Sequence, residues 1–147
     1  PAASFTALTP RLINVSVLRQ IVSGGDLQLG FTVKGSTATT VLIRVIGPGL
    51  GAVVPGITGT LSDPQLTLYS NNTGAVIATN DDWGADSQIT TAGSRVNAFP
   101  VGSAGAKDAM LLITLPVPLP QGSGYTAKAT GNAGTSGLAI VEVYEVP

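Results

Sequence analysis

The sequence predicts an all-β protein, an antiparallel β-sandwich of the Greek-key or jelly-roll (immunoglobulin-like) type. Short clusters of Val, Ile and Leu alternate with polar residues at the period of two that marks half-buried strands. Nineteen Gly and ten Pro separate these clusters, as is typical of sandwiches and barrels. The 147 residues match one domain, which is large enough to bury a core.

Three strands are predicted in the first third of the chain. Apolar and polar residues alternate most clearly over residues 27–33, and similar alternation precedes them at residues 13–17. Residues 39–46 are apolar on both faces, which predicts a central strand. The spacing favours a meander, in which each of these strands pairs with the next.

The middle of the chain predicts a long loop, a hairpin and a second loop. Residues 47–64 contain five Gly and three Pro and are expected to form a crossing loop without a helix. Residues 65–69 and 75–79 flank the turn Asn71-Asn72-Thr73-Gly74, which predicts a hairpin. The polar residues 80–100 are expected to be irregular.

The last third predicts the remaining strands, for a total of eight or nine. Residues 108–115 form an apolar run that ends at a proline-rich segment, which favours a buried strand. Residues 125–130 and 137–146 are predicted to be the final pair. We expect the core to include one large apolar residue from each of several strands, namely Leu29, Phe31, Ile43, Leu68 and Leu112.

Composition excludes several classes of function. Charged residues make up 10% of the chain and the net charge is −1, so no basic surface is expected for nucleic acid or an anionic membrane. The absence of Cys and His removes disulfides, thiolate zinc sites and the Ser-His-Asp triad. No apolar run approaches the 18 or more residues that span a bilayer.

The sequence also predicts that the protein is not an enzyme and has no catalytic residues. Its two glutamates, Glu142 and Glu145, lie three residues apart on one predicted strand and therefore on opposite faces, where they could not act as a glycosidase pair. The glycines of Gly47-x-Gly49-x-Gly51 are similar to half of a phosphate-binding loop, but no lysine follows them.

A hairpin motif carries a resemblance to a known family. The segment DPQLTLYSNNTGAVIAT at residues 63–79, followed by NDDWG at residues 80–84, resembles the pre-peptidase C-terminal type of secreted bacterial β-sandwich. Residues 41–50 look like a module of large bacterial surface proteins, and residues 124–129 and 139–145 fit the terminal strands. The resemblance implies an accessory, adhesive or structural domain that is extracellular, secreted or on the cell surface. It transfers no catalytic residue.

Oxygen-bearing side chains gather after the second strand of this hairpin. Asn80, Asp81, Asp82 and Asp86 could bind calcium, which prefers six to eight oxygen ligands. Asp63 or Asp108 could then contribute across the fold. The alternative is that these side chains cap turns by accepting hydrogen bonds from nearby backbone N–H groups. The sequence leaves both alternatives open, and no other cofactor is indicated.

Two further residues indicate contact with sugars. Trp83 could stack on a sugar ring, or it could close one end of the core with its N–H bonded to a carbonyl. Asn71 begins an N-glycosylation sequon in the predicted hairpin turn and is therefore a candidate for a covalent glycan.

The first ten residues predict an assembly element. Residues 1–10 carry small and apolar residues in alternation, so we divide the chain into an extended arm (1–10) and a sandwich domain (11–147). Such an arm can complete the sheet of a neighbouring copy, and repetition of that contact gives a fibre. Alternatively, the arm folds onto its own sheet. The residues expected to make the contact are Ala3, Phe5, Ala7 and Leu8.

Two functions follow from these observations. The first is an extracellular structural subunit that assembles with copies of itself into a filament or surface layer, because so few charges leave much apolar surface to cover. The alternative is a secreted module that binds carbohydrate or a cell-surface partner.

Overall fold

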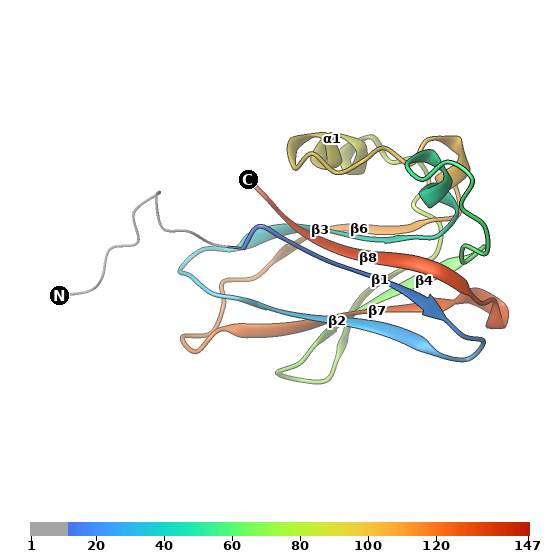
Figure 1. Ribbon diagram of the computed structural model, residues 1–147. Helices are drawn as coiled ribbons and strands as arrows, with labels where there is room; N and C mark the ends of the chain where they lie inside the picture. The colour runs from blue at the N-terminus through green and yellow to red at the C-terminus, as the bar shows by residue number, and fades with distance from the viewer. Residues whose placement is uncertain (1–11) are drawn as a thin grey trace.

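The protein is a sandwich of two four-stranded sheets, seen in a computed structural model that describes residues 12–147 (Figure 1). One sheet has the strand order β1-β8-β3-β6 and the other has the order β2-β7-β4-β5. All pairings between these strands are antiparallel. The strands are β1 (Asn14–Ile21), β2 (Asp26–Val33), β3 (Thr39–Ile46), β4 (Pro64–Ser70), β5 (Val76–Asn80), β6 (Ala109–Leu115), β7 (Ser123–Gly131) and β8 (Gly137–Val146).

This order confirms the predicted sandwich and is that of an eight-stranded jelly roll. The first strand pairs with the last, β2 with β7, β3 with β6, and β4 with β5. Strand β3 lies between β8 and β6, as its two apolar faces predict. The hairpin of β4 and β5 is also confirmed, with a β-bulge between Leu68 and Tyr69.

Two predicted pairings are wrong. Strands β1, β2 and β3 do not form a meander, because β2 lies in the opposite sheet from the other two. Strands β7 and β8 are likewise in different sheets and do not pair with each other. The short connections between these strands carry the chain across the roughly 10 Å that separates packed sheets. Alternation along a strand shows which residues face the core, but it does not identify the partner strand.

The prediction that the chain contains no helix is also wrong. Helix α1 (Ser87–Arg95) lies within the segment expected to be irregular, and short 3₁₀ helices occur at η1 (Pro48–Ala52), η2 (Ser103–Gly105) and η3 (Asn132–Gly134). Asp86 caps α1 by accepting a hydrogen bond from the backbone N–H of Gln88 at 2.7 Å. Ile89 and Ala92, three residues apart on one helical face, are both buried.

The apolar residues form two clusters. The larger one fills the space between the sheets and contains Ile43 and Leu68, which are fully buried as predicted. Leu29 and Phe31 pack against its margin on the edge strand β2 and are only partly buried. The second cluster lies on the outer face of the β1-β8-β3-β6 sheet, under α1 and η1, and Leu112 packs there instead of between the sheets.

The two outer faces of the sandwich therefore differ. Helix α1 and its flanking segments cover the outer face of the β1-β8-β3-β6 sheet, which we call the covered sheet (Figure 1). The β2-β7-β4-β5 sheet carries no such layer, and we call it the open sheet (Figure 1). Within residues 12–147, no helix is long and apolar enough to cross a membrane.

Candidate functional site

Two of the four predicted calcium ligands, Asn80 and Asp86, form hydrogen bonds with backbone groups. The carboxylate of Asp86 caps α1. The side-chain oxygen of Asn80 accepts a hydrogen bond from the backbone N–H of Met110 at 2.8 Å, and its amide donates to the carbonyl of Asp82 at 3.2 Å. The bond of Asp86 therefore agrees with the turn-capping alternative, whereas Asn80 accepts from a residue 30 positions away and links β5 to β6.

The other two predicted ligands join a mixed cluster that includes a lysine. The side-chain amide of Asn132 donates to Asp63 and to Asp81, each at 3.2 Å. The ammonium of Lys107 lies 3.2 Å from Asp82 Oδ2 and 3.7 Å from Asp63 Oδ1. The hydrogen bond to Asp82 is the main reason why the pKa of Lys107 is raised. One cationic side chain thus offsets part of the negative charge of these carboxylates.

Calcium binding by Asp81 and Asp82 stays a prediction. In the part of the chain that the structure describes, no group of three or more Asp, Glu, His or Cys side chains is arranged to hold a metal ion. Asp108, another residue expected to contribute, is hydrogen-bonded to the backbone of Gly47 and Gly49 instead.

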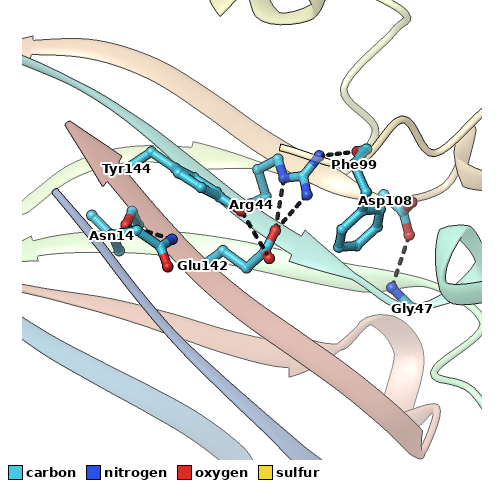
Figure 2. Close-up of polar contacts among 8 residues, drawn as sticks. Asn14, Arg44, Gly47, Phe99, Asp108, Glu142 and Tyr144 are labelled. Atoms are coloured by element: carbon cyan, nitrogen blue, oxygen red, sulfur yellow. Dashed lines mark hydrogen bonds and ion pairs between the residues drawn. The ribbon is translucent and has the colours of Figure 1, made fainter. Parts of the chain in front are cut away.

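Asp108 is fully buried and is held by the glycine-rich segment that resembles a phosphate loop. The backbone N–H groups of Gly47 and Gly49 donate to Asp108 Oδ1 at 2.8 and 3.4 Å (Figure 2). A Cβ atom on Gly49 would lie 2.2 Å from Asp108 Oδ2, so this approach requires glycine. The segment therefore binds an anion, but the anion is a carboxylate of the same chain. Burial raises the pKa of Asp108 to about 6.

Trp83 has the structural role that the sequence left as one of two alternatives. Its indole N–H donates to the carbonyl of Gly105 at 2.8 Å, and its ring packs against the second apolar cluster. The aromatic surface of Trp83 is thus committed to packing within the protein.

A buried charge cluster on the covered sheet was not predicted. Arg44 on β3 and Glu142 on β8 are each 4% exposed and face each other across the two strands. The Arg44 Nε and Nη2 atoms donate to Glu142 Oε2 at 2.9 and 2.5 Å, and Nη1 donates to the carbonyl of Phe99 at 2.7 Å (Figure 2). The Tyr144 hydroxyl donates to Glu142 Oε1 at 3.0 Å.

These contacts give the cluster a structural role. The Arg44 guanidinium also lies 4.4 Å from the centre of the Phe99 ring, a cation–π distance. Burial, followed by the charge of Glu142, raises the pKa of Tyr144 to about 12. The cluster joins the segment after α1 to the covered sheet. An arginine and a glutamate, each within an otherwise apolar strand, could have indicated this pair once β3 and β8 were known to be neighbours.

The outer face of the open sheet holds the candidate binding site. A shallow depression of about 250 Å³ is lined by Gln28, Tyr69, Asn71, Thr126 and Lys128. Thr126 of β7 stands opposite Gly30 on one side and opposite Tyr69 on the other, so these residues form one row across three strands. Gly30 is exposed and carries no side chain, so the row ends in bare backbone next to the residues that line the depression.

Polar side chains surround this row. Asp26 Oδ2 lies 3.3 Å from the Lys128 ammonium and accepts a hydrogen bond from the Gln28 amide at 3.1 Å. These contacts, with the Gln28 hydrogen bond as the largest cause, lower the pKa of Asp26. On the other side, Asn71 Oδ1 accepts a hydrogen bond from the Thr126 hydroxyl at 2.9 Å. The depression is therefore rimmed by amide, hydroxyl and paired charged groups.

Sequence reasoning missed Tyr69, Gln28 and Lys128 as site residues. It predicted Asn71 as a glycan acceptor, and the structure places Asn71 at an exposed turn beside the depression. Attachment of a glycan to Asn71 stays a prediction.

A larger hollow of about 380 Å³ lies between α1 and the end of the covered sheet. It contains no aromatic side chain, and its wall includes Pro147, the last residue of the sequence. The depression on the open sheet, in contrast, is built entirely from paired strands and the β4–β5 turn.

Comparisons with known proteins concern the fold. No protein-family model matches the chain, and no protein of curated function matches it. The chain is similar to the pre-peptidase C-terminal domain of a Bacillus anthracis collagenase, at 12% identity over 89% of both chains with a TM-score of 0.49. It is also similar to a mitogen from Yersinia pseudotuberculosis, at 12% identity over 89% of this chain and 84% of that one, with a TM-score of 0.49.

A third similar structure is a family 35 carbohydrate-binding module from Clostridium thermocellum, at 12% identity over 88% of this chain and 90% of that one, with a TM-score of 0.36. The collagenase domain is of the type that the hairpin motif at residues 63–84 resembles.

Proposed function

We propose that this protein is an extracellular module that binds carbohydrate on the outer face of the open sheet. The observation that carries the proposal is the row formed by Gly30, Thr126 and Tyr69, which places an aromatic residue beside a depression with a polar rim. This is the alternative function that the sequence predicts, but at a different site from Trp83.

The chemistry of the depression suits a sugar. The C–H face of a pyranose ring packs on an aromatic ring, while its hydroxyl groups need both donors and acceptors. Tyr69 supplies the ring, and the amide, hydroxyl and charged groups of Gln28, Asn71, Thr126 and Lys128 surround it. The volume of about 250 Å³ suits one sugar unit of a longer chain that lies across the strands.

The assembly function depends on a different part of the chain. The arm at residues 1–10, with Ala3, Phe5, Ala7 and Leu8, lies outside the residues that the structure describes. Assembly into a filament through this arm therefore stays a prediction. We favour the binding function because every residue on which it depends is described.

The role of Tyr69 is tested by substitution. Tyr69→Ala removes the ring and is expected to weaken binding to soluble neutral polysaccharides by about two- to tenfold, which corresponds to the roughly 0.5–1.5 kcal/mol typical of an aromatic contact. Tyr69→Phe keeps the ring and should retain most of the affinity. Affinity electrophoresis against β-glucan, xylan and mannan measures both variants.

Gly30 offers a sharper test, because it separates binding from folding. A Cβ atom at Gly30 would have its nearest neighbour, the Tyr125 carbonyl oxygen, at 3.9 Å, so Gly30→Thr fits the strand and adds a side chain next to Thr126, which lines the depression. We expect this variant to lose binding without a fall in melting temperature, since threonine favours strands more than glycine does. Gly51→Thr on η1 is the matched control, because a Cβ there meets nothing within 4 Å.

The proposal predicts different effects of the two glycine substitutions on polysaccharide binding. Gly51→Thr should bind like the unmodified protein. Unchanged affinity in Gly30→Thr, or failure of the unmodified protein to bind any polysaccharide of the panel, would overturn the proposed function.

A further inference from the structure

We infer that Asp26 sets the charge class of the ligand, so that the open sheet takes neutral glycans and rejects glycans that carry uronic acids. The inference rests on the proposed function and adds its specificity. It follows from how one carboxylate engages two of the groups that line the depression.

Lys128 and Gln28 are the side chains of the depression that could best hold an acidic sugar. The two side chains lie next to each other on adjacent strands, because Gln28 of β2 is paired with Lys128 of β7. Both also contact the same atom, Asp26 Oδ2, with the ammonium at 3.3 Å and the amide at 3.1 Å. Asp26 therefore already engages each of the two donor groups that a ligand carboxylate would use, and leaves their remaining N–H groups available.

Charge reinforces this competition. Lys128 is the charged residue among the five that line the depression, and Asp26 neutralises it. The two side chains remain 32% and 36% exposed, so a ligand can reach them. A uronate close enough to contact Lys128 would also approach the Asp26 carboxylate, and the repulsion between like charges would oppose its binding.

A neutral sugar meets no such repulsion. Its hydroxyl groups can donate to the Asp26 carboxylate and accept from Lys128 or Gln28 at the same time. The hydrogen bonds from Gln28 and Lys128 lower the pKa of Asp26, so the carboxylate stays ionised over the pH range in which polysaccharides are commonly bound. The same three side chains thus favour hydroxyl groups and exclude carboxylates.

The test compares two polymers and two aspartate variants. The unmodified protein should bind soluble β-glucan at least tenfold more tightly than polygalacturonate. Asp26→Ala releases Lys128 and Gln28, so binding to polygalacturonate should strengthen by about fivefold or more, while binding to β-glucan weakens. The gain should disappear at about 1 M salt, where the screening length is roughly 3 Å.

Asp82→Ala is the matched control. Asp82 is paired with Lys107 at 3.2 Å outside the depression, so its removal changes the net charge by the same amount, while Lys107 keeps Asp63 at 3.7 Å. It should leave both affinities unchanged. An equal gain of polygalacturonate binding in Asp82→Ala would show that net charge, not the site, decides the ligand.

The outcomes separate the two proposals. Equal binding of both polymers by the unmodified protein, or the absence of a gain in Asp26→Ala, would overturn the role of Asp26 and leave the sugar-binding function standing. Failure of the unmodified protein to bind either polymer would overturn the proposed function and, with it, this inference.

Discussion

One arginine, one aspartate and one glutamate are almost completely buried within residues 12–147, and they are stabilised in two different ways. Arg44 and Glu142 compensate each other, with the Phe99 carbonyl and the Tyr144 hydroxyl completing the contacts. Asp108 accepts hydrogen bonds from two backbone N–H groups, but its Oδ2 atom has no partner among the described residues. A buried ion pair and a buried lone carboxyl should respond differently to substitution and to pH.

Removal of one partner of the buried pair should be strongly destabilising. Glu142→Ala leaves the Arg44 guanidinium buried without its carboxylate and is expected to lower the free energy of unfolding by about 3–5 kcal/mol. Urea unfolding followed by far-ultraviolet circular dichroism measures the change. The double variant Arg44→Met, Glu142→Met should recover most of the loss, because apolar residues can replace such a pair. A loss below about 1 kcal/mol in the single variant would contradict this assignment.

Asp108 should make the stability depend on pH. Its pKa of about 6 in the folded protein exceeds the ordinary value of 3.8, so the folded state binds this proton more tightly than the unfolded chain does. The contribution is complete below about pH 4 and is lost as the pH rises through about 6; it amounts to about 3 kcal/mol. The charge of Arg44 favours the ionised form and limits the shift.

The variant Asp108→Asn isolates this contribution. The stability difference between the unmodified protein and the variant should be larger at pH 4 than at pH 7.5, in favour of the unmodified protein. Urea unfolding at both values provides the measurement, and a difference that does not change with pH would exclude a titrating Asp108.

At the scale of elements, the sequence predicts the strands well and their partners poorly. Alternation is a local property, so β1 to β8 could be located from short windows of sequence. Pairing joins distant segments, as in the contact of Asn14 with Tyr144, and no local pattern contains that information. Helix α1 was missed because its Thr, Ser and Gly residues have weak helical propensity; the Asp86 cap and the burial of Ile89 and Ala92 stabilise it.

The candidate site shows the same difference between what local sequence predicts and what depends on strand pairing. The capping role of Asp86 could be stated from the sequence because its partner, the Gln88 N–H, is two residues away. The two alternatives for Trp83 could be named but not resolved, since its partner Gly105 lies 22 residues away. Tyr69 could not be recognised, since its row with Thr126 and Gly30 exists only when β4, β7 and β2 are adjacent. A functional surface on a sheet is a property of strand order.

The loop that precedes α1 should be stabilised by capping, independently of calcium. Asp86→Ala removes the helix cap and is expected to lower the free energy of unfolding by about 1 kcal/mol. The loss should be the same in calcium and in a chelator, because the cap is the hydrogen bond from the Gln88 N–H to Asp86, which involves no metal. Thermal melting under both conditions tests this. A melting temperature that rises with calcium would instead support the metal site predicted from the sequence.

At the scale of the molecule, the two sheets have different roles. The covered sheet carries α1, the buried ion pair and the second apolar cluster, which stabilise that side of the sandwich. The open sheet leaves its polar outer face free for a ligand, and its strands are held in register by the core beneath them. This division explains why the charged and aromatic groups of the covered sheet contact one another, whereas Tyr69 borders an accessible depression.

The most direct test of this account is an NMR titration of the isotope-labelled protein with a soluble neutral β-glucan oligosaccharide. Backbone amide signals of Gln28, Gly30, Tyr69 and Thr126 should shift progressively with ligand concentration, because Gln28, Tyr69 and Thr126 line the depression and Gly30 is paired with Thr126. The indole signal of Trp83 should stay in place, since its N–H is bonded to Gly105. Shifts confined to α1 and the loop around Trp83, with the open sheet unchanged, would contradict the account.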